Sequence, residues 1–185
     1  MGIRDDELKR LEAYAKSLGI RVTYRKSKKE HSNAAEFYID GSGIIVYTWP
    51  GLSKTRTVLN LLHECAHAVH WVHTKRAIDK ELMKALVKEA NRCKGEVLDE
   101  SDRKLIYEDE HVATNYWNQI VKLVDIRINP MVILLRKKLD IFTYRYYYET
   151  GEFPTNAVIN QKKKEFIHEE RTKSKQTRRA SSKRN

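Results

Sequence analysis

The motif H-E-x-x-H at residues 63–67 constrains what this chain can fold into more than any other part of its sequence. Apolar residues recur around the motif at alternating spacings of four and three: Val58, Leu62, Cys65, Val69 and Val72. This period predicts a helix with one face in the core. On such a helix His63 and His67 lie one turn apart, roughly 6 Å along the axis, so their ring nitrogens can converge on one metal ion.

Glu64 lies about 100° around this helix from His63, where it flanks the ion without binding it. H-E-x-x-H on a helix is typical of zinc sites in which the Glu is a general base. Zinc lowers the pKa of water to about 7, and the carboxylate can take that proton and pass it to a leaving amine. The motif therefore predicts a Zn²⁺ site bound by His63 and His67, with Glu64 as the catalytic residue.

A catalytic zinc needs a third protein ligand and one open position. His73 has the spacing of H-E-x-x-H-x-x-G-x-x-H, but that longer motif needs a glycine three residues past its second His so that the chain can leave the helix. His70 occupies that position here. On an unbroken helix His73 points about 240° away from His67, which disfavours it without removing it as a candidate.

A downstream helix, predicted over residues 101–128, offers other candidates in the acidic run Glu108-Asp109-Glu110. Acidic residues near a helix start are ordinarily explained by the helix dipole. Glu110 differs because the small Ala113 follows it by one turn and allows close approach to the helix of the motif. Glu108 remains an alternative ligand, about 200° from Glu110 around the helix, so the two cannot serve together.

Residues 110–116 have the form E-x-x-A-x-x-(aromatic). With the motif at 63–67, this segment resembles the ImmA/IrrE-type metallopeptidases, over roughly residues 35–130. The resemblance implies that Glu110 completes a zinc shell begun by the two histidines and that Glu64 is the base. It also implies a regulatory protein, such as a DNA-bound repressor, as the substrate.

The remaining pattern predicts an α+β, zincin-like fold with a small antiparallel sheet packed on a mostly helical core. Helices are expected at 5–18, 78–90 and 131–148, and strands at 21–24, 36–39 and 44–47. Residues 40–43, Asp-Gly-Ser-Gly, predict a hairpin between the last two strands, and Ser53 is expected to cap the motif helix. Segment 44–48, or a neighbour, is expected to present an edge with which an extended peptide substrate pairs.

Charge separates the C-terminal end from the rest of the chain. Residues 161–185 hold 10 Lys and Arg against 3 Asp and Glu, a net of +7 out of +11. We therefore expect a metallopeptidase domain at 1–160 and a basic, disordered tail at 161–185, because so polar a segment buries too little to fold alone. The tail could bind nucleic acid through its phosphates, or only aid solubility.

Two cysteines, Cys65 and Cys93, provide no disulfide framework and are expected to be reduced thiols in a cytoplasmic protein. No apolar run approaches 18 residues and the N-terminus lacks a signal-peptide pattern, so no membrane partner is expected.

The expected function is a zinc-dependent metalloprotease that hydrolyses peptide bonds in a protein substrate. The alternative is a non-catalytic nucleic-acid-binding or assembly protein whose zinc stabilises the fold, which closed four-ligand coordination would favour. A third reading is a protease similar to the SprT-like and WLM groups, acting on DNA-bound proteins, with activity that rises when DNA is added.

Overall fold

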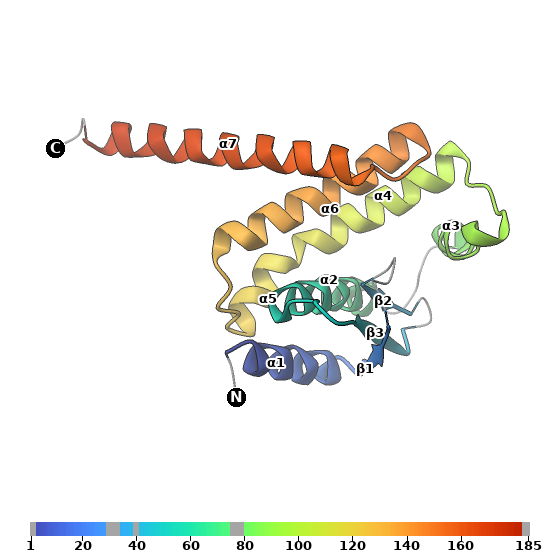
Figure 1. The fold of residues 1–185 in the computed structure, drawn as a ribbon. Coiled ribbons are helices and arrows are strands. Elements are labelled where there is room, and N and C mark those ends of the chain that lie inside the picture. The colour runs from blue at the N-terminus through green and yellow to red at the C-terminus, as the bar shows by residue number, and fades with distance from the viewer. Residues whose placement is uncertain (1–2, 29–33, 39–40, 75–79, 183–185) are drawn as a thin grey trace. The chain divides into compact units, whose positions relative to one another are not determined.

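The computed structural model describes residues 3–28, 34–38, 41–74 and 80–182. Its elements in chain order are α1 (Ile3–Ser17), β1 (Arg21–Lys26), β2 (Ala35–Phe37), β3 (Gly43–Thr48), α2 (Lys54–His73), α3 (Lys80–Ala90), the 3-10 helix η1 (Arg92–Lys94), α4 (Glu100–Asn115), α5 (Trp117–Leu123), α6 (Pro130–Thr150) and α7 (Asn156–Ser182) (Figure 1). They form two compact units, residues 1–129 and 130–185. The predicted α+β class is confirmed by a small sheet packed against helices in the first unit.

The sheet is mixed, so the prediction of an antiparallel sheet is wrong. Its order is β1-β3-β2, with β1 parallel and β2 antiparallel to β3. The predicted hairpin is confirmed, since Phe37 lies opposite Ile44. Hairpin signals are local, whereas the parallel partner of β3 comes from 22 residues earlier in the chain and leaves no local turn signal.

Segment 44–48 lies in the middle strand, so it presents no edge, and the edge strands of the described sheet are its neighbours β1 and β2. The middle of β3 is covered on both faces: Ile44, Ile45 and Val46 are exposed by no more than 2%. A run of consecutive apolar residues is typical of a strand buried on both sides, and an alternating pattern is typical of one that faces water.

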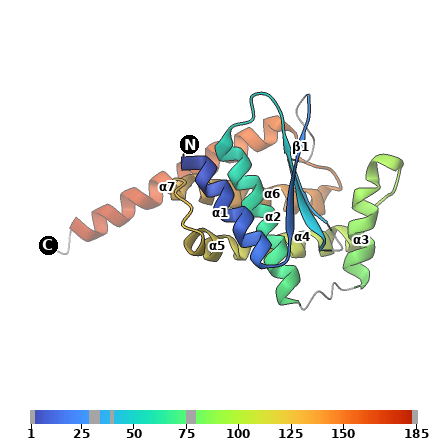
Figure 2. The same cartoon turned by 90° about the horizontal axis from the view of Figure 1, so that it is seen from below.

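Helix α2 is the central element of the first unit and contacts α1, both strands of the hairpin, α4 and α5. Figure 2 shows α1 running beside it. Ser53 caps its start as predicted, because the Ser53 side chain accepts a hydrogen bond from the Arg56 N–H at 3.2 Å. The apolar stripe is confirmed as core from Val58 to Val69, with Leu62 and Cys65 fully buried, whereas Val72 near the end of the helix is partly exposed. Cys65 is a free thiol, and the side chain of Cys93 lies outside the described residues.

The single helix expected at 101–128 is two helices, α4 and α5, which meet at Tyr116. The Tyr116 N–H bonds to the Ala113 carbonyl three residues back, a tighter turn than that of an α-helix. Asp99 and Asp102 form a capping box that begins α4 at Glu100. The acidic run at 108–110 therefore lies more than two turns inside the helix, where a helix-dipole explanation does not apply.

The second unit is a pair of helices, α6 and α7, which contact each other. Tyr147 of α6 is buried and stacks on Phe153 in the connection, with ring centroids 4.4 Å apart. Residues 161–182, expected to belong to a basic tail, lie within α7, and the two compact units divide after Asn129. No helix in the described part of the chain is both long and apolar enough to cross a membrane.

Candidate metal site

The three predicted ligands come together on α2 and α4. The Nε2 atoms of His63 and His67 lie 3.3 Å apart, and each lies 3.3 Å from Oε2 of Glu110. Three ligands held tetrahedrally at about 2.0–2.1 Å from a zinc ion are about 3.3–3.4 Å from one another. The ligand atoms therefore already have the spacing that zinc requires, and the group fits the ion.

Local helix geometry and close packing of the two helices produce this arrangement. His63 and His67 occupy successive turns of α2, so their rings project from one side of the helix. Glu110 arrives from α4, and Ala113 one turn later is 1% exposed. The absence of a large side chain at that turn lets α4 approach α2 closely, as the sequence pattern predicted.

The competing third ligands lie elsewhere. Glu108 is exposed and points toward Lys104, with 3.9 Å between the charged atoms. His73 Nδ1 lies 3.2 Å from the Tyr116 hydroxyl. Among the described residues, the group that can hold a metal consists of His63, His67 and Glu110.

The sequence pattern did not predict a role for Asp109, whose carboxylate lies beside the Nδ1 atoms of His67 and His70. Its Oδ2 lies 3.4 Å from Nδ1 of His67, and its Oδ1 lies 3.1 Å from Nδ1 of His70. A carboxylate on the far nitrogen of a metal-binding histidine fixes the ring orientation and makes the other nitrogen a better ligand. The available signal was that Asp109 directly precedes the predicted ligand Glu110, while His70 follows His67 by nearly one turn.

The electrostatics of the site favour a bound cation. Burial alone would lower the pKa of His67, but the carboxylates of Glu110 and Asp109 raise it well above its usual value. Burial would raise the pKa of Glu110, but the two imidazoles hold it well below its usual range. Burial opposes ionisation of Asp109 too, yet hydrogen bonds from His67 and His70 lower its pKa to about 2. The carboxylates of Glu110 and Asp109 therefore favour a positive charge beside the two imidazoles.

Glu64 lies beside the ligands without belonging to their group. It is 8% exposed, and this burial raises its pKa despite the two neighbouring imidazoles. The backbone N–H of Phe37 in β2 faces this carboxylate and acts in the opposite direction, lowering its pKa. Glu64 therefore lies between the two histidines of α2 and the edge strand β2.

Two buried polar groups border the site without hydrogen-bond partners among the described residues. The Trp117 ring meets His63 edge-on at 5.9 Å between centroids, and its indole N–H is buried and unpaired. Asn60, one turn before Glu64 on α2, is 2% exposed, with both amide atoms unpaired. Each such group costs about 1–3 kcal/mol of stability, so both are available to a water molecule or a ligand.

Comparison of the chain with protein-family models, with curated proteins and with solved structures found no match in any of the three.

Proposed function

We propose that this chain is a zinc-dependent metalloprotease with a zincin-like fold, whose ligands are His63, His67 and Glu110. The observation that carries the proposal is the triangle of ligand atoms, 3.3 Å on each edge, with the buried carboxylate of Glu64 next to it. Structural zinc sites are closed by four protein ligands, whereas catalytic sites have three and an open position. The described residues offer three, which favours catalysis over a purely structural zinc.

When bound, a zinc ion polarises a carbonyl and lowers the pKa of water to about 7. The protein's own contribution is positioning and proton transfer. Glu64 takes a proton from the attacking water and delivers it to the leaving nitrogen of the peptide, a role for which a raised pKa is suited. Asp109 keeps the His67 ring in its binding orientation.

β2 is an edge strand of the described sheet, and this position supports an extended peptide as the substrate. The Tyr38 N–H donates a hydrogen bond to the Gly43 carbonyl at 2.9 Å, so the even-numbered residues from 34 to 38 are those whose backbone groups pair with β3. The backbone groups of Ala35 and Phe37 therefore point to the opposite edge of β2, away from β3. A peptide added as a strand along that edge would pass the carboxylate of Glu64, which the Phe37 backbone N–H faces.

The direct test compares Glu64→Gln with the wild type in zinc content and in cleavage of an unfolded protein mixture followed by mass spectrometry. We expect Glu64→Gln to keep its zinc and lose turnover, because the amide cannot accept the proton. The exposed Glu108→Gln serves as the matched control and should match the wild type in both. Unchanged cleavage by Glu64→Gln would remove Glu64 from the mechanism.

A non-catalytic zinc protein would respond differently to chelation. Removing a structural zinc unfolds such a domain, whereas a catalytic site loses activity and retains its fold. We expect circular dichroism at 222 nm to change little when stoichiometric chelator is added. Cooperative unfolding on chelation would favour the structural reading.

A further inference from the structure

The excess of positive charge belongs to the second unit. Residues 130–185 hold 14 Lys and Arg against 6 Asp and Glu, a net of +8 out of the chain's +11. Residues 1–129, more than two thirds of the chain, therefore contribute only +3. A partner attracted by the charge of this protein would meet it chiefly on the α6–α7 pair.

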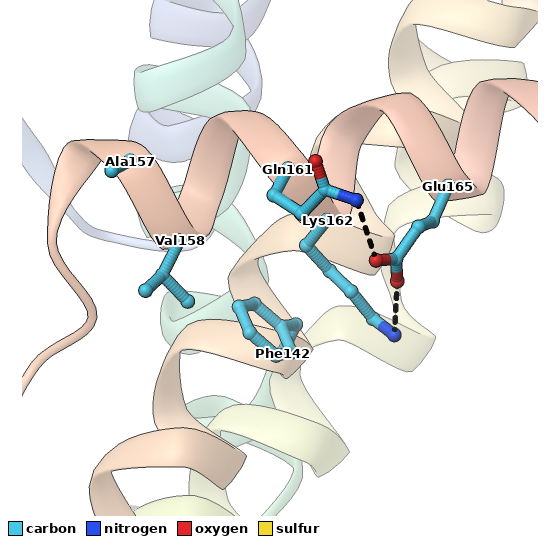
Figure 3. A pocket seen from close by; sticks show the side chains of 6 residues that line it. All are labelled: Phe142, Ala157, Val158, Gln161, Lys162 and Glu165. Atoms are coloured by element: carbon cyan, nitrogen blue, oxygen red, sulfur yellow. Dashed lines mark hydrogen bonds and ion pairs between the residues drawn. The ribbon is translucent and has the colours of Figure 1, made fainter.

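The acidic side chains of α7 are engaged in local ion pairs and in contact with α6. Glu170 lies 2.7 Å from Lys138 of α6 and 3.2 Å from Lys173. Figure 3 shows the start of the same side, where Val158 and Lys162 of α7 lie over Phe142 of α6 and Glu165 pairs with Lys162 at 3.0 Å. These pairs neutralise the helix on the side that packs against α6.

Another side of α7 is basic and carries no compensating charge. At 100° per residue, Lys164, Arg171 and Lys175 fall within an arc of about 40°, and every acidic residue of the helix lies at least about 80° outside it. All three side chains are exposed. None of them forms an ion pair with another residue that the structure describes. They constitute the basic face of α7.

We propose that the basic face of α7 binds the phosphate backbone of double-stranded nucleic acid without reading its sequence. The three side chains are spaced about 10.5 and 6 Å along the helix axis, and duplex DNA places a phosphate every 3.4 Å or so along each strand. Each charge can therefore meet a different phosphate. This proposal concerns a surface of the second unit and does not depend on the metal site.

The side chains of α7 disfavour the other polyanions. Single strands are held by exposed aromatic rings, but the one aromatic residue of α7, Phe166, is half-buried beneath the ammonium groups of Lys138 and Lys162, 5.1 and 5.2 Å away. A helix that binds a lipid surface needs an apolar strip beside its basic one. From Glu169 to Ser182 the only hydrophobic residue is Ala180.

The test measures binding of the full-length protein to a fluorescent 20-base-pair DNA duplex between 50 and 200 mM NaCl. The variant replaces Lys164, Arg171 and Lys175 together by Gln, which favours helix. Each phosphate contact contributes about 0.9 to the slope of log affinity against log salt. Loss of three contacts should make this negative slope less steep by about 2.7. Between 50 and 200 mM NaCl the wild type should therefore lose about 40-fold more affinity than the variant.

A matched control replaces Lys16, Lys84 and Lys104, exposed on α1, α3 and α4, by Gln and has the same net charge. It should keep the wild-type slope, and circular dichroism should show equal helix content in all three proteins. Equal loss of slope in both variants would reduce the effect to net charge and overturn the proposal. So would absence of duplex binding by the wild type, or binding to phosphatidylserine vesicles with none to the duplex.

Discussion

Replacement of Glu110 by Gln tests the assignment of the third ligand most directly. Gln has the same shape and keeps one oxygen, but it removes the negative charge that lies 3.3 Å from both imidazole nitrogens. Zinc sites with four protein ligands bind with about 10–16 kcal/mol, or about 3 kcal/mol for each ligand. Because each 1.4 kcal/mol is tenfold, we expect Glu110→Gln to bind zinc about 100-fold more weakly than the wild type.

The assay is competition for zinc with a chromophoric chelator at constant pH, with circular dichroism of each metal-free protein to show that it folds. Glu108→Gln is the matched control, since Glu108 lies on the same helix but is exposed and directed toward Lys104. It should bind zinc as the wild type does. Equal zinc affinity of the two variants would refute the ligand assignment. If Glu108→Gln bound zinc weakly and Glu110→Gln bound it as the wild type does, Glu108 would be the ligand.

Three further variants test the surroundings of the site and the core. Asp109→Asn should weaken zinc binding by about 10- to 100-fold in the same competition, and unchanged affinity would exclude a supporting role. Gly41→Ala would place its methyl group in the Trp71 ring, whereas the methyl group of Gly51→Ala, also at positive φ, meets no atom within 4 Å. We expect a larger drop in Tm for Gly41→Ala, and equal drops would contradict the overlap with Trp71. Leu62→Ala should cost about 2–5 kcal/mol in urea unfolding, and a loss below about 1 kcal/mol would place Leu62 outside the core.

The sequence predicts well those features that a single stretch of backbone determines. The helical period places His63 and His67 on one side of α2, and Ser53 caps that helix in the structure. The hairpin of β2 and β3 likewise follows from the turn residues between two apolar runs. Each of these features depends on residues within one or two turns of one another, so their spacing alone carries the information.

The tertiary structure decided how separate segments meet. Glu110 and Glu108 are both acidic residues on α4, and only the packing of α4 on α2 directs one toward the histidines and the other into solvent. The same contact brings Asp109 behind His67, a role that its position in an acidic run did not predict. The parallel partner of β3 is another example, because pairing across a long connection depends on the burial of whole faces. The periodicity of a helix follows from local backbone geometry, so the sequence shows it directly. Which element packs against each face depends on how the entire core packs, so only the tertiary structure shows it.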